Sequence, residues 1–187
     1  MSQSLSKIYV HIVFNIKYSS VTILEKDLPK LFSYIDGIIV NSKAAVMQIG
    51  GISNHIHILC TLPRTLSVAK FVEEIKRSSS IYIKTLDRHY AKFAWQGGYA
   101  IFSVSESQLD KVKNYVINQK EHHRKKTFEE EYIDFLKAYN IEYDNNIENF
   151  VLLIDDFHNI KISDKYENDF LQSITNFFNK IYFFVDK

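Results

Sequence analysis

The sequence has a single cysteine, Cys60, among its 187 residues. One thiol forms no internal disulfide and supplies no thiolate cage for zinc, so a reducing cytoplasm is the simplest compartment to expect. No apolar run approaches the roughly 18 residues that span a bilayer, and no basic-then-apolar leader opens the chain. We therefore expect an unprocessed cytoplasmic protein with no membrane segment.

The chain also lacks an excess of charge of either sign. It has 23 Lys and Arg against 22 Asp and Glu, for a formal net charge of +1. Any affinity for nucleic acid must therefore depend on how the charges are distributed. With 46% hydrophobic and 24% charged residues, the composition is that of a globular protein and excludes a disordered or collagen-like chain.

The spacing of apolar residues predicts alternating strands and helices in one domain. Alternation with a period of two predicts strands at 8–16, 45–49, 55–62 and near 99–104, each with one buried face. Helical spacing and N-cap signals predict helices at 24–44, 67–86, 105–124 and from a capping box at Thr127 and Glu130 through Leu136. In the first strand, Tyr9, His11, Val13 and Asn15 form the more polar face.

This order of strand, helix, strand, strand, helix, strand favours an α+β fold. We expect a ferredoxin-like antiparallel sheet whose helices pack on its apolar face, with the other face free as a working surface. Residues 1–144 form this predicted domain. Residues 145–187 contain no glycine or proline and are rich in Asn, Ile, Phe, Asp and Lys, so we treat them as an extension of unknown role.

Two pairs of side chains are candidates for chemistry. His55 and His57 lie one residue apart in a predicted strand, so both imidazoles project from one face about 7 Å apart and can chelate a divalent metal. Tyr115 and Gln119 lie four residues apart in a predicted helix, which places a phenol beside an amide oxygen that can serve as a third ligand. Taken alone, such histidines are more often hydrogen-bonded structural residues, and a helical tyrosine is more often a packing residue.

A set of motifs in fixed order gives these residues a context. The motifs are His11-Ile-Val-Phe14 with Lys17-Tyr18, Asn54-His-Ile-His-Ile-Leu59, Trp95-Gln-Gly-Gly-Tyr99, Phe102-Ser-Val-Ser105, Tyr115-Val-Ile-Asn-Gln119, Glu121-His-His-Arg124 and Thr127-Phe-Glu-Glu-Glu131. From about Ser6 to Asp144 the chain resembles the small tyrosine transposases of the IS200 and IS605 insertion elements and their relatives associated with repeated palindromes. Many members of that family carry an acid where this chain has Asn54.

The resemblance implies a function and a site. Tyr115 would attack a phosphodiester of single-stranded DNA, forming a 5'-phosphotyrosine link and a free 3'-hydroxyl, with the tyrosine on a C-terminal helix. His55, His57 and Gln119 would hold Mg²⁺ or Mn²⁺, and no nucleotide cofactor would be needed. The resemblance also implies recognition of DNA hairpins at element ends by a homodimer, in which the tyrosine helix of one subunit can complete the metal site of the other.

Polar residues elsewhere are weaker candidates for DNA contact, since a basic helix face is usually just solvated. These candidates are Lys17, Tyr18, Lys76, Arg77, Lys120, His122, His123 and Arg124. We expect His11 to be structural rather than a metal ligand. Three alternatives to an active transposase stay open: a host-retained relative that processes repeated palindromes, an inactive hairpin-binding dimer, and an α+β domain that never meets DNA.

Overall fold

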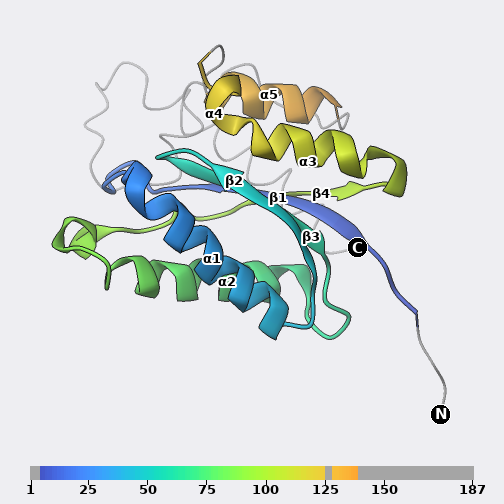
Figure 1. Cartoon of the computed structure of the whole chain (residues 1–187), viewed down its shortest axis with the longest axis horizontal. Coiled ribbons are helices and arrows are strands. Elements are labelled where there is room, and N and C mark those ends of the chain that lie inside the picture. The colour runs from blue at the N-terminus through green and yellow to red at the C-terminus, as the bar shows by residue number, and fades with distance from the viewer. Residues whose placement is uncertain (1–4, 125–127, 139–187) are drawn as a thin grey trace, which may run out of the picture. The chain divides into compact units, whose positions relative to one another are not determined.

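The computed structural model describes residues 5–124 and 128–138 (Figure 1). The predicted capping box at Thr127 and the predicted extension 145–187 lie outside these ranges. The described part contains a four-stranded antiparallel sheet of β1 (Tyr9–Asn15), β2 (Val46–Gly51), β3 (His55–Thr61) and β4 (Ala100–Val104), in the order β2-β3-β1-β4. This order is the ferredoxin-like arrangement that the sequence predicted.

Helices α1 (Leu28–Asn41) and α2 (Val68–Ile83) pack on one face of the sheet (Figure 1). α2 begins where the sequence predicted, because the Ser67 hydroxyl accepts a hydrogen bond from the amide of Lys70 at 3.2 Å. The core between these helices and the sheet is fully buried and apolar, and its members include Ile12, Ile35, Ile58, Phe71 and Ile75. Burial of these side chains is the main stabilising contribution to this layer.

The first helix is anchored by a buried acid. Asp27, in the 3₁₀ turn Glu25–Asp27, accepts hydrogen bonds from the Tyr90 hydroxyl and the Lys30 ammonium, both at 3.0 Å. Tyr90 belongs to the 3₁₀ turn Arg88–Lys92. Burial alone would raise the pKa of Asp27, but the hydrogen bonds outweigh it and hold that pKa below its usual value. The charged carboxylate therefore ties the start of α1 to a distant turn.

The opposite face of the sheet is covered as well. The strand register places His11 and Val13 on the same face as His57 and Leu59. α3 (Leu109–Ile117), which follows the 3₁₀ turn Glu106–Gln108, packs on β2 and β3 over part of that face. A second apolar cluster forms there from Tyr9, Leu59 and Val104 with Met47, Leu109 and Val112. The first two helices thus pack on the apolar face as expected, and the C-terminal helices lie across the face predicted to be free (Figure 1).

A glycine allows α3 to approach the sheet closely. A Cβ atom at Gly50, on β2, would collide with the backbone carbonyl of Val116. Because Val116 follows Tyr115 directly, this close approach also sets the height of Tyr115 above the sheet. No side chain larger than hydrogen fits at position 50 without moving the helix.

The helix predicted at 105–124 is interrupted in the structure, so the prediction of one continuous helix is wrong. α3 ends at Ile117, Asn118 has φ −91° and ψ 18°, and a short α4 (Gln119–His122) follows. The Asn118 side-chain amide donates to the Asn114 carbonyl at 2.9 Å, the same carbonyl that accepts from the Asn118 backbone amide at 3.1 Å. Asparagine favours such local bonds over regular helix. Gln119, the residue after the break, is buried. The last described helix is α5 (Phe128–Ala138).

Candidate active site

His55 and His57 project from β3 into the space beneath the C-terminal helices. Both side chains are fully buried, and their ring centroids are 5.0 Å apart. His55 Nδ1 donates to the side-chain oxygen of Asn54 at 2.8 Å. His57 Nδ1 lies 3.0 Å from His11 Nε2. Each Nδ1 is therefore occupied, and each Nε2 faces the interior, which is how metal-ligating histidines are oriented in proteins.

Asn54 and His11 contact the Nδ1 atoms of the two histidines. The side-chain oxygen of Asn54 accepts the His55 Nδ1 proton and so fixes the orientation of that ring. His11 is 1% exposed, and its ring stacks on that of His57 with centroids 5.2 Å apart. His11 does not belong to the group of side chains whose ligand atoms converge, so it orients His57 from behind.

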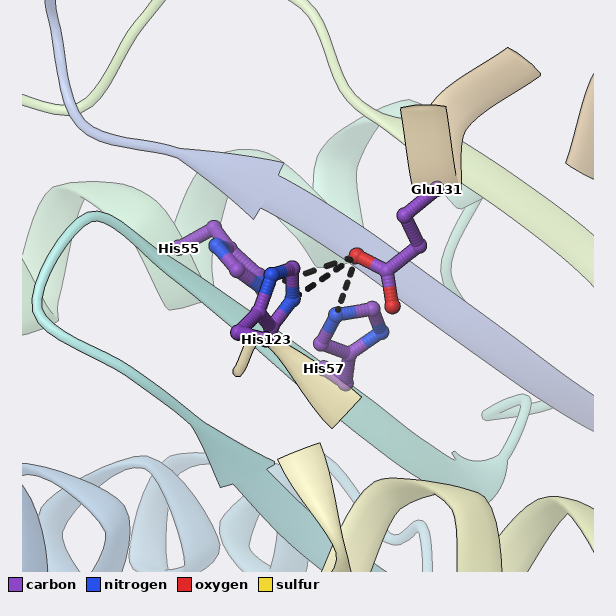
Figure 2. A group of neighbouring side chains, drawn as sticks. All are labelled: His55, His57, His123 and Glu131. Carbon is purple, nitrogen blue, oxygen red and sulfur yellow. Dashed lines mark ion pairs between the residues drawn. The ribbon is translucent and has the colours of Figure 1, made fainter. Parts of the chain in front are cut away.

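Two further side chains complete the cluster around the histidine pair. Glu131 Oε2, from α5, lies 3.2 Å from His123 Nε2, 3.6 Å from His57 Nε2 and 3.7 Å from His55 Nε2 (Figure 2). One ligand atom from each of these four residues lies within 4.8 Å of the others. The sequence singled out His123 only as a candidate for DNA contact, and Glu131 only as part of a motif.

Gln119 lies against the same cluster. Its side chain is 1% exposed, and its Oε1 lies 3.3 Å from His55 Nε2 and 3.1 Å from His123 Nε2. Its Nε2 donates to Glu131 Oε1 at 3.1 Å. Because His55 uses its Nδ1 proton on Asn54, its Nε2 presents a lone pair to the Gln119 oxygen. Two acceptor atoms that face each other in this way suit a cation between them.

Burial sets the charge of the cluster. It lowers the pKa of His55 to about 2, with His57 and His123 adding to the effect, and it lowers the pKa of His57 to about 3. Both rings are therefore neutral at pH 7 and have a lone pair to offer. Burial, aided by Asp134, raises the pKa of Glu131 to about 8. Among the described residues no Lys or Arg pairs with Glu131, and its Oε2 makes no hydrogen bond.

These residues fit a divalent metal ion. Ligands held about 2.0–2.2 Å from a metal stand roughly 3.0–3.4 Å from one another. The 3.2–3.7 Å distances between Glu131 Oε2 and the three imidazoles need only a small contraction to reach that geometry. A bound cation would also favour the ionised form of Glu131 and compensate its charge, since no Lys or Arg of the described residues pairs with it.

Tyr115 stands at the rim of the cluster, on α3 of the same chain. Its ring packs edge-on against the rings of His57, His11 and His122, with centroid distances of 5.8, 6.2 and 5.1 Å. It also lines a surface cavity of about 440 Å³. The structure thus brings together His55, His57, Gln119 and Tyr115, the four residues that the sequence singled out for chemistry.

Most of the basic residues considered for DNA contact are engaged in local pairs. Arg77 pairs with Glu74 at 2.9 Å, Arg124 with Glu121 at 3.0 Å, and Lys120 with Glu25. Lys76 donates to the carbonyls of Gln96 and Gly98. Pairs of this kind at a surface are weak enough to be exchanged for a phosphate, so DNA contact by these residues stays a prediction.

The remaining four candidates for DNA contact differ in exposure. Tyr18 is 67% exposed, and Lys17 is half-buried beside it. His122 lines the cavity with Tyr115, and its Nε2 lies 3.8 Å from Glu131 Oε1. The His123 side chain is only 7% exposed, so its place is in the metal cluster.

The fold and the site together define a ferredoxin-like domain with a candidate metal centre and a tyrosine at its rim. The family description "Transposase IS200 like" matches residues 4–119, more than half of the chain. The protein therefore belongs to the IS200-like transposases, a family of enzymes that cut and join DNA.

Two solved structures are similar to this chain. One is a protein of Deinococcus radiodurans R1 described as a transposase, with 17% identity and a TM-score of 0.49, covering 64% of this chain and 98% of its own. The other is described as a REP-associated tyrosine transposase bound to a REP hairpin. It has 15% identity and a TM-score of 0.48, covering 66% of this chain and 74% of its own. Among curated protein sequences no significant match is found.

None of the helices within 5–124 and 128–138 is long and apolar enough to cross a membrane.

Proposed function

We propose that this protein is a metal-dependent transposase that cleaves and rejoins single-stranded DNA at hairpin-bearing element ends through Tyr115. The observation that carries the proposal is the position of Tyr115, whose ring centroid lies 5.8 Å from that of His57, a member of the candidate metal cluster. A phenol beside a buried set of metal-ligating atoms has what a nucleophile needs to reach a metal-bound phosphate.

His55, His57 and Gln119 are the proposed metal ligands, and the structure supports adding His123 and Glu131 to them. We propose Mg²⁺ or Mn²⁺ as the ion. Imidazole nitrogens suit transition metals, whereas Mg²⁺ prefers oxygen ligands, so three imidazoles favour Mn²⁺ of the two. The bound ion would neutralise charge that develops on the phosphate in the transition state.

Tyr115 is the proposed nucleophile in the cleavage of the strand and the leaving group in its rejoining. The Tyr115 oxygen forms a bond to phosphorus, the bond from phosphorus to the 3'-oxygen breaks, and the phenol gives up its proton while the 3'-oxygen gains one. The product is a 5'-phosphotyrosine and a free 3'-hydroxyl. Because a phenolate is a good leaving group, a 3'-hydroxyl can reverse the step, and no nucleotide cofactor is required.

Two further parts of the proposal concern partners, namely a second subunit and a DNA hairpin. Tyr115 and the proposed ligands lie close together within one chain. The family resemblance implies a homodimer in which the tyrosine helix of one subunit can complete the metal site of the other. Hairpin recognition also rests on that resemblance. A host-retained relative that processes palindromes would use the same site, whereas an inactive hairpin-binding dimer gains nothing from placing Tyr115 beside the cluster.

A covalent-adduct assay tests the proposal. Labelled single strands covering the DNA that flanks the gene are mixed with the protein in Mn²⁺, Mg²⁺ or EDTA, and an adduct that survives denaturation is sought. We expect an adduct with metal only, lost in Tyr115→Phe and kept in Tyr34→Phe, a control on α1 at the other side of the sheet. An adduct that persists in Tyr115→Phe would refute the nucleophile. Hairpin binding without any adduct would favour the inactive dimer.

A further inference from the structure

The surface cavity beside Tyr115 contains residues that the proposed chemistry does not use. The cavity is lined by residues of α3 and α4 and by Asn118 between them, and it has a volume of about 440 Å³. Its lining consists of Lys111, Asn114, Tyr115, Asn118, Glu121 and His122. The spacing of these residues by three or four positions makes them one continuous stripe on the helix surface.

Lys111 gives the cavity an available positive charge. It is exposed and lies one helical turn before Tyr115. Within the described part of the chain its ammonium has no hydrogen bond or ion pair, in contrast to Lys120 and Arg124. The carboxylate in the lining, that of Glu121, is paired with Arg124 at 3.0 Å. The unbalanced charge of the cavity is therefore positive.

The rest of the lining offers an aromatic surface and polar edges. The rings of Tyr115 and His122 meet edge-on with centroids 5.1 Å apart. The Asn118 amide nitrogen is used within the helix, which leaves its side-chain oxygen as an acceptor beside the exposed carboxamide of Asn114. Aromatic rings that receive a base, with donors for phosphate at their edge, are how proteins bind single-stranded nucleic acid.

We propose that this cavity is the subsite for the nucleotide next to the scissile phosphate, with Lys111 bound to the flanking phosphate. The substrate strand then runs along α3 towards the metal cluster. One helical turn separates Lys111 from Tyr115, a spacing comparable to that of consecutive phosphates in an extended strand. The inference rests on the proposed function, since it assumes that Tyr115 meets single-stranded DNA.

A matched pair of variants tests the role of Lys111. Lys113 is exposed on the same helix and does not line the cavity, so Lys113→Gln removes the same charge at a different place. Binding of a labelled single strand spanning the cleavage site is measured by fluorescence anisotropy between about 50 and 200 mM salt, in a Tyr115→Phe background to prevent cleavage. Lys111→Gln is expected to reduce the slope of log affinity against log salt by about 0.7, with Lys113→Gln leaving it unchanged and Lys111→Arg restoring it.

A second measurement addresses the base. An abasic nucleotide placed next to the cleaved bond, on either side in turn, is expected to weaken binding roughly tenfold at one of the two positions only. Equal slopes for the Lys111→Gln and Lys113→Gln variants, or no loss at either abasic position, would overturn the subsite. If the wild type still forms its tyrosine adduct in that case, the proposed function stands and only the subsite fails. If neither strand binding nor adduct is found, both fall together.

Discussion

Replacing Glu131 with glutamine tests whether this residue is a metal ligand or a structural acid. Its Oε2 lies 3.2–3.7 Å from three imidazole nitrogens and makes no hydrogen bond among the described residues. If His55, His57, His123 and Glu131 ligate a metal, a free metal concentration of 100 times the dissociation constant stabilises the wild type against unfolding by about 2.7 kcal/mol. For a domain of this size that corresponds to a rise of about 5–11 °C in the unfolding temperature.

Glu131→Gln should remove most of that rise. Loss of even an outer-sphere partner typically costs 10- to 100-fold in metal affinity, and loss of a ligand costs more. A hundredfold loss leaves about 0.4 kcal/mol of stabilisation at the same Mn²⁺ concentration, or about 1 °C. In EDTA the variant should be about as stable as the wild type. Burial raises the pKa of Glu131 to about 8, so near pH 7 a neutral amide replaces a largely protonated carboxyl, with which no Lys or Arg of the described residues pairs.

The measurement is thermal unfolding in EDTA and in Mn²⁺, with Glu130→Gln as the matched control. Glu130 is the preceding residue on α5 and is exposed. The control should keep the full metal-induced shift. A Glu131→Gln protein that keeps the shift, or that loses several degrees in EDTA alone, would show that Glu131 is a structural acid and that the reasoning from convergent distances is wrong.

Three further outcomes follow from single residues. Asp27→Asn should lower stability by about 1–3 kcal/mol at pH 7. Because the pKa of Asp27 is lower in the folded protein, its contribution to stability is fully present above its usual pKa near 3.8. That contribution is lost as the pH falls through the folded-state pKa. The free energy of unfolding in urea should therefore differ less between pH 7 and pH 3 in the variant than in the wild type. Cys60 should resist thiol reagents until the protein unfolds, since burial raises its pKa to about 12. Gly50→Ala should displace α3 and abolish the tyrosine adduct, whereas Gly37→Ala, where a Cβ meets nothing within 4 Å, should leave activity intact.

Much of the framework followed from local periodicity. The alternation along β1 and β3 predicted which residues share a face, and it placed His55 and His57 together on one side of the sheet. The four-residue spacing of Tyr115 and Gln119 predicted that these two side chains lie on one helix face, and the helix between them breaks at Asn118. Only the family resemblance implied that they belong with the histidine pair. These features depend on the geometry of one strand or one helix, which repeats every two or 3.6 residues and can therefore be read along the chain.

The membership of the metal cluster was decided only by the tertiary structure. His123 looked like one more cation in a basic stretch, and Glu131 like a first-turn acid of the last helix. Neither has a fixed spacing from His55, which lies more than 60 residues earlier in the chain. Their convergence depends on how α3 to α5 fold back over the sheet. That packing is set by the glycine at position 50 and by contacts between distant elements, and no local period encodes it.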